Sequence, residues 1–127
     1  MTFLCVDTGP VAAYGNPKNV EDAPKFVDYV RGYEAFPNRT TYDLVFDDGR
    51  SRVAVAYQAY HLMNSDSVLL VHDYPTKDNI ERQHYKDIEQ YFEKIDVRSR
   101  LAVFRKRMGV EPPSKILIEE QALTYHR

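Results

Sequence analysis

Apolar and polar positions follow two kinds of pattern along this chain. Short runs rich in β-branched and aromatic residues, each closed by turn-forming or polar residues, predict β-strands. Four such runs cover residues 3–7, 42–46, 67–72 and 100–105. The second run, YDLVF, is apolar at nearly every position, which is typical of a strand buried on both faces of a parallel sheet.

Longer segments place their apolar residues at helical spacing. Residues 51–63 follow the second strand and predict a helix of about three turns. Residues 80–95 have apolar side chains on one face and charged side chains on the other, which predicts an amphipathic helix. A last helix over residues 114–125 begins at Ser114, a residue type suited to the N-cap position. Residues 25–36 predict only a short helical turn, closed by a Pro-Asn pair.

The order of these elements indicates the fold class. Strands that alternate with helices form βαβ units with right-handed crossovers. The sequence therefore predicts an α/β fold with a mostly parallel, open sheet of about four strands covered by helices. A length of 127 residues suits one domain, and we expect it to span residues 1–127.

Acidic and basic side chains gather where the predicted strands end. The first strand ends at Asp7, the second runs into Asp47 and Asp48, and the third ends at His72 and Asp73. Ligands of open α/β sheets bind outside the carboxyl ends of the strands. We therefore expect these three strand ends to open on one edge of the sheet.

The DDGR stretch after the second strand combines two acids, a glycine and an arginine. Adjacent residues of an extended chain point to opposite faces, so Asp47 and Asp48 diverge. One acid, for which Asp48 is favoured, enters the cleft, and the other caps the following helix. Gly49 permits a sharp turn into that helix. Arg50 and Arg52 either pair with these acids or hold an anionic ligand through bidentate hydrogen bonds.

The HDYP stretch after the third strand offers a second set of candidates. His72 can act as a general base near neutral pH, with Asp73 as its orienting acid or as a metal ligand. A direct hydrogen bond between the two is not the expected geometry, because adjacent strand residues point apart. Pro75 favours an extended conformation at Tyr74, which places Tyr74 among the cleft candidates. The alternative is a structural histidine at a strand end.

Charge and cysteine content narrow the function classes. The net charge of −2 gives no overall attraction for nucleic acid or for an anionic membrane. The basic residues of segment 98–107 flank an apolar strand, where charged residues guard against edge pairing. Cys5 is the only cysteine; it can form no disulfide within the chain, and we expect a buried thiol in a reducing compartment. With no signal-peptide pattern and no apolar stretch of about 20 residues, the expectation is a cytoplasmic protein without a membrane span.

Motifs for metals and phosphates are nearly absent from the sequence. No spaced His and Cys cluster suggests zinc, and no Gly-rich phosphate loop occurs. Asp48 and Asp73, at neighbouring strand ends, form a pair that can share a hard divalent cation. A small metal-dependent hydrolase is therefore one alternative function, although a metal is not our leading expectation.

The segment YDLVFDDGRSRVAVAYQAYHLMNSDSVLLVHDYP resembles the second half of class I S-adenosylmethionine-dependent methyltransferases. Residues 43–46 match the fourth strand of that Rossmann-like fold, with Asp48 as its terminal acid. Residues 68–71 match the fifth strand, with Asp73 as its terminal acid. The whole looks like an uncharacterised, methyltransferase-like branch of the superfamily.

The resemblance implies roles for the residues that match. S-adenosylmethionine is the implied cofactor, with Asp48 and Gly49 next to it. His72 or Asp73 is the implied base that deprotonates an acceptor hydroxyl or amine. In catechol-type members an Asp-Asn pair binds metal, whereas this chain has Asp73 and Tyr74, so the resemblance implies no metal site.

One part of the family pattern is missing. The Gly-rich loop that holds the methyl donor has no counterpart in this sequence. We therefore expect a reduced or inactive member, or a fragment, whose S-adenosylmethionine-binding half is absent. A sheet without its first strands has an unpaired edge, which a homo-oligomer, a partner chain or a rearranged N-terminus can cover. The alternative is a non-catalytic binding or assembly module that keeps the fold as a homo-oligomer.

Overall fold

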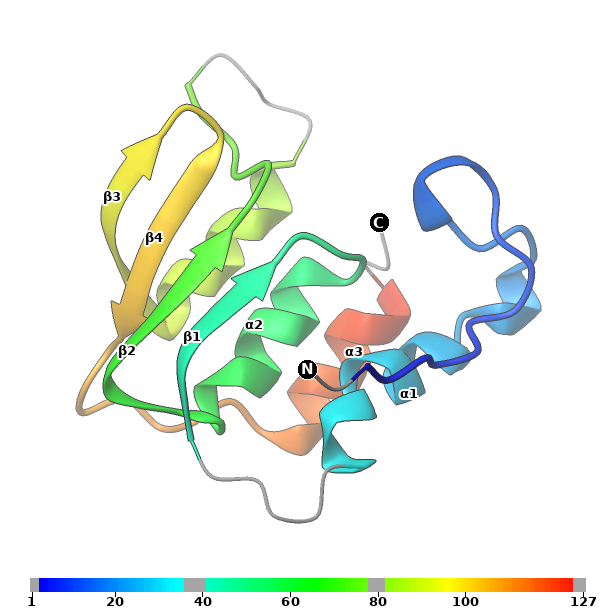
Figure 1. The fold of residues 1–127 in the computed structure, drawn as a ribbon, viewed down its shortest axis with the longest axis horizontal. Helices are drawn as coiled ribbons and strands as arrows, with labels where there is room; N and C mark the ends of the chain where they lie inside the picture. The colour runs from blue at the N-terminus through cyan, green and yellow to red at the C-terminus, as the bar shows by residue number, and fades with distance from the viewer. Residues whose placement is uncertain (1–2, 36–40, 78–81, 125–127) are drawn as a thin grey trace.

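Four strands form one open sheet in the computed structural model, which describes residues 3–35, 41–77 and 82–124 (Figure 1). The strands lie in the order β1-β2-β4-β3. Their bounds are Tyr42–Asp47 for β1, Met63–Val71 for β2, Phe92–Arg98 for β3 and Leu101–Lys106 for β4. The helices are α1 (Lys25–Val30), α2 (Arg52–Tyr60) and α3 (Lys115–Thr124), with short 3₁₀ segments η1 (Ala13–Gly15), η2 (Val20–Asp22), η3 (Gly32–Ala35) and η4 (Gln83–Gln90).

The sheet is mixed rather than mostly parallel. β1 and β2 are parallel, whereas β2 with β4 and β4 with β3 are antiparallel. The predicted α/β fold with an open four-stranded sheet is confirmed, but the prediction of mostly parallel strands is wrong. Only a two-residue turn at Ser99 and Arg100 joins β3 to β4, and so short a connection permits only an antiparallel hairpin.

Residues 3–7, predicted as the first strand, do not form one. A strand needs a neighbour for its backbone N–H and C=O groups, and no described strand pairs with this segment. It runs instead as an extended, mostly exposed segment near α1. Cys5 is exposed there, which corrects the expectation of a buried thiol.

The helix predicted over residues 80–95 is confirmed only in part: residues 83–90 are helical but form a 3₁₀ helix, and the prediction is wrong from residue 92 onward. The chain forms the 3₁₀ segment η4 and then turns into strand β3. Tyr85, Ile88 and Tyr91 recur every three residues, which matches the three residues per turn of a 3₁₀ helix. The expected start of that helix, at residues 80 and 81, lies outside the described residues.

The core lies between one face of the sheet and a helical layer that contains α2 and η4 (Figure 1). Helix α2 is buried on nearly all sides, with Val53, Ala54, Ala56, Tyr57 and Tyr60 in the core cluster. A helix that is apolar all round needs neighbours on several sides, and α1, α3 and η4 supply them. The N-cap predicted for α3 is confirmed, since the Leu117 amide donates to Ser114 Oγ at 3.1 Å.

The opposite face of the sheet carries no helix of the described chain (Figure 1). Leu44 and Phe46 of β1 project from it with exposed fractions of 58% and 59%. Their register partners on β2, Val68 and Leu70, are half-buried, and Val103 of β4 continues the row. We call Leu44, Phe46, Val68, Leu70 and Val103 the open face. β1 is also an edge strand of the sheet, with no further described strand beside it.

Among the described residues, no helix is long and apolar enough to cross a membrane.

Candidate functional site

The turn between β1 and α2 is tight and strained. Ser51, the N-cap residue directly before α2, has a φ of +53°, a conformation uncommon for residues other than glycine. A Cβ atom on Gly49 would overlap the hydroxyl oxygen of Tyr29, so only glycine fits without a shift. The turn therefore presents the side chains on either side of Gly49 at a fixed position above the sheet.

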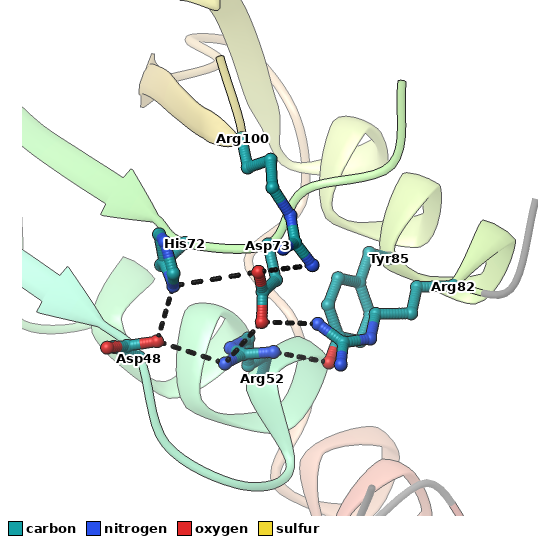
Figure 2. Close-up of polar contacts among 7 residues, drawn as sticks. All are labelled: Asp48, Arg52, His72, Asp73, Arg82, Tyr85 and Arg100. Atoms are coloured by element: carbon teal, nitrogen blue, oxygen red, sulfur yellow. Dashed lines mark hydrogen bonds and ion pairs between the residues drawn. The ribbon is translucent and has the colours of Figure 1, made fainter. Parts of the chain in front are cut away.

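Two neighbouring parallel strands bring Asp48 and His72 together. The His72 backbone N–H donates to the Asp47 carbonyl oxygen at 3.0 Å, which continues the β1–β2 ladder beyond the strands. His72 Nδ1 lies 2.8 Å from Asp48 Oδ1, and both side chains are half-exposed (Figure 2). His72 Nδ1 is 3.8 Å from Asp73 Oδ1, too far for a hydrogen bond. His72 thus pairs with Asp48 at the end of the neighbouring strand β1, and not with the adjacent Asp73.

Asp73 is surrounded by guanidinium groups (Figure 2). Its carboxylate oxygens lie 2.5 Å from Arg82 Nη1, 2.7 Å from Arg100 Nη2 and 3.7 Å from Arg52 Nη2. Burial alone would raise the pKa of Asp73, but the hydrogen bond and charge of Arg82, with the charge of Arg100, hold that pKa below its ordinary value. Asp73 therefore stays ionised and is a weak base.

Arg52 links the two acids to η4. Its Nη2 lies 3.1 Å from Asp48 Oδ1, and its Nη1 donates to the Tyr85 hydroxyl at 2.7 Å. The side chain is buried, which makes these contacts stronger than they would be in water. The Arg52 guanidinium also lies over the Tyr85 ring, with its Cζ 5.4 Å from the ring centroid.

Asp47 takes a different role from Asp48. It is only 2% exposed and shares the core-facing side of β1 with Val45. Burial raises the pKa of Asp47 to about 8, although the charge of Arg52 and the Gly49 N–H oppose the rise. Asp47 is therefore mostly neutral near pH 7. Neither of the acids caps α2 by a side-chain hydrogen bond.

A cavity of about 320 Å³ adjoins this cluster. Asp48, Gly49, Arg50 and Arg52 line one side of it, and Tyr29 of α1 lies among the residues on the other. The cavity thus lies at the carboxyl edge of β1, where the sequence predicted a ligand site.

The structure brings most of the predicted site residues together. Asp48, Arg52, His72 and Asp73 form one polar cluster, and Gly49 and Arg50 line the adjoining cavity. Two candidates lie elsewhere. Tyr74 is buried, with its ring against Phe104 and its hydroxyl donating to Glu89. Asp7 accepts a hydrogen bond from the Gly9 amide and lines a separate surface hollow near α1.

Three members of the cluster were not among the predicted site residues: Arg82, Tyr85 and Arg100. Arg100 stood out only as a basic residue beside a strand. Because β4 is antiparallel to β2, its first residues lie at the carboxyl end of β2, and the Tyr74 amide donates to the Arg100 carbonyl at 3.0 Å. The short connection between β3 and β4, which permits only an antiparallel hairpin, was the sequence feature that could have indicated the position of Arg100.

No group of three or more His, Cys, Asp and Glu side chains in the described part of the chain is arranged to hold a metal ion. Asp48 and Asp73, the pair considered for a divalent cation, both contact Arg52. A cation would have to displace that arginine.

The fold is similar to a known structure. A crystal structure of a methyltransferase-like protein from Silicibacter pomeroyi superposes with a TM-score of 0.74 and 23% sequence identity. The match covers 94% of this chain and 59% of that chain. Comparisons with protein-family models and with curated protein sequences find no match. The chain therefore has a methyltransferase-like α/β fold, and about two-fifths of the similar protein has no counterpart in it.

Proposed function

We propose that this chain provides one half of a methyltransferase-like domain: the half with the carboxyl-edge cluster but without the S-adenosylmethionine-binding loop. The observation that carries the proposal is the open face beside the unpaired edge of β1. Leu44 and Phe46 leave apolar surface exposed on β1, the strand that leads into Asp48. A parallel strand paired with β1 and a helix over the open face would complete a doubly covered sheet.

The residues present do not suffice to hold S-adenosylmethionine. No Gly-rich loop occurs in the sequence, and Tyr29 occupies the space next to Gly49. Asp48 and Gly49 would therefore contribute only part of a cofactor site. The missing loop and the position of Tyr29 both support the proposal that the chain is a reduced member or a fragment.

The chemical contribution of the chain is a base at the carboxyl edge. His72 is half-exposed and can take a proton from an acceptor hydroxyl or amine, while Asp48, 2.8 Å from its Nδ1, orients the ring. Asp73, which is held ionised by arginines, fits a positioning role better than the role of base.

A non-catalytic assembly module is the second candidate, because the same open face suits a second copy of the chain. Soluble oligomers are most often symmetric homo-oligomers. In that case the apolar residues of β1 are buried between copies, and the polar cluster stabilises the sheet edge.

Substitution of Phe46 by lysine tests the open face. We expect the purified chain either to form an oligomer or, as a monomer, to bind the apolar dye ANS. In both cases Phe46→Lys should abolish the effect, measured by size-exclusion chromatography with light scattering and by dye fluorescence. Ile116→Lys is the matched control, since Ile116 is 71% exposed on α3, away from the sheet. A monomer that binds no dye, or equal effects of both variants, would contradict the proposal.

A ligand measurement tests the missing cofactor half. We expect millimolar S-adenosylhomocysteine to leave the melting temperature of the isolated chain unchanged. A complete site with a Kd of about 0.1 mM would add roughly 1.4 kcal/mol to the unfolding free energy at about 1 mM ligand. A reproducible upward shift in melting temperature would show that the chain holds the cofactor by itself.

A further inference from the structure

The cavity beside the polar cluster has features of a binding site in its own right. It lies between the N-terminal segment and the β1–α2 turn and measures about 320 Å³, in the range of small-molecule sites. Its lining combines aromatic rings, from Tyr14, Phe26 and Tyr29, with two arginines, Arg50 and Arg52. Ligand pockets typically combine such apolar walls with a few fixed polar groups.

Positive charge is in excess around this cavity. Asp48 pairs with Arg52, and Asp73 pairs with Arg82 and Arg100, while Arg50 lies in the wall of the same cavity. Asp47 adds little negative charge near pH 7, because burial raises its pKa to about 8. Asp48 and Asp73 are thus already paired with other arginines, and neither forms an ion pair with Arg50.

Arg50 is the arginine best placed to meet a ligand. It forms no ion pair with a described acid, and it is half-buried against the loop at Gly15. Burial lowers the pKa of Arg50, and the positive charge of Arg52 lowers it further. A guanidinium in such surroundings gains from a bound anion, because the anion supplies the missing counter-charge.

Arg52 also lines this cavity, but its side chain is more than nine-tenths buried. Its guanidinium is already held by Asp48 and by the Tyr85 hydroxyl, so Arg50 is the cavity's arginine that can meet a ligand.

We propose that this cavity binds a small organic anion, a carboxylate or a phosphate ester with a planar ring. Arg50 binds the anionic group, the ring packs between the aromatic walls, and Tyr14 closes the rim. Tyr14 is 88% exposed, so its ring is available for stacking on a ligand. Anion binding needs neither a cofactor nor a covering half-domain; under the proposed function, the anion would be the methyl acceptor.

The test is an NMR chemical-shift titration of the ¹⁵N-labelled chain. The probes are benzoate, phenyl phosphate, inorganic phosphate and, as the uncharged analogue, benzyl alcohol. We expect the aromatic anions to shift the amides of the β1–α2 turn, with millimolar dissociation constants. Benzyl alcohol should bind at least about tenfold more weakly, because it cannot form the charge-assisted hydrogen bonds. Benzoate against phenyl phosphate distinguishes a carboxylate site from a phosphate site.

Two variants separate the roles of charge and ring. Arg50→Gln should weaken both aromatic anions and inorganic phosphate by about tenfold. Tyr14→Ser removes an exposed ring; it should weaken only the aromatic anions and leave inorganic phosphate unchanged. Arg105→Gln is the matched control, since Arg105 is an exposed arginine on β4 and not a lining residue.

Three outcomes would overturn the proposal: no binding of either aromatic anion, equal binding of benzyl alcohol, or an equal loss in Arg105→Gln. None of these depends on S-adenosylmethionine or on the oligomeric state. A failure here therefore leaves the proposed function standing, and the reverse also holds.

Discussion

Asp47 provides a quantitative test of the site, because its carboxyl group is buried at the end of β1. Burial raises its pKa in the folded chain to about 8, against an ordinary value of 3.8. The perturbation is Asp47→Asn, which keeps the size and a neutral, hydrogen-bonding side chain but removes the titration. The two proteins should therefore differ in how their stability depends on pH.

The direction follows from proton binding. The folded chain binds the Asp47 proton more tightly than the unfolded chain does, so this group's contribution to stability is complete below pH 3.8 and is lost as the pH rises toward about 8. Each pH unit in that window lowers the unfolding free energy by about 1.4 kcal/mol. Between about pH 5 and pH 8 the loss amounts to roughly 4 kcal/mol, and Asp47→Asn should not show it.

Urea unfolding at several pH values measures this difference. Far-UV circular dichroism or tyrosine fluorescence can follow it, since the chain has no tryptophan. Other titrating groups, such as His84, whose pKa is lowered by burial, cancel when the two proteins are compared. Asp43→Asn is the matched control, because Asp43 is an exposed acid on the same strand. Parallel pH profiles for the wild type and Asp47→Asn would refute the reasoning.

Three further predictions concern single contacts. Ser114→Ala removes the N-cap of α3 and should lower the unfolding free energy by about 1 kcal/mol in urea titrations; an unchanged midpoint would contradict the cap. Gly49→Ala should lower the unfolding free energy by about 1–3 kcal/mol, because the added Cβ overlaps the Tyr29 hydroxyl. In the double variant with Tyr29→Phe, part of this loss should be recovered. Purely additive losses would exclude that overlap. Cys5 is exposed and should react with a thiol reagent at a rate close to that of the urea-unfolded chain; strong protection would place it in a core instead.

The elements that sequence alone predicted correctly are those with strong local patterns. β1, β2 and β4 were predicted from short apolar runs, which are typical of buried strands. α2 was predicted because its apolar segment is long enough for a helix and is interrupted by polar residues at helical spacing. β3 was missed because its residues, FEKIDVR, are largely charged and exposed, and because Ile95 also fitted the end of a helical pattern. The hairpin turn gave little signal, since Ser99 and Arg100 are not the usual turn pair.

Only the part of the site that depends on the parallel pairing of β1 and β2 could be predicted from the sequence. Asp48 and His72 end adjacent parallel strands, so their approach follows from the β1–β2 pair alone. Arg100 could not be placed, because a parallel β4 would have put it at the opposite edge of the sheet. Arg82 and Tyr85 depend on the path of η4, for which the sequence indicated a different helix. The core-facing position of Asp47 follows from its alternation with Val45 along β1. Its raised pKa could not be predicted, because it depends on how completely the surrounding residues bury the carboxyl group.

The exposed edge of β1 is the central claim, and amide hydrogen exchange of the isolated chain tests it most directly. In an edge strand, every second backbone N–H points away from its neighbour and has no ladder partner. At dilutions where light scattering shows a monomer, β1 should exchange much faster than β2, which has strands on both sides. Equal protection of β1 and β2 in that monomer would mean that the edge is already covered, and would contradict the proposal of a half-domain.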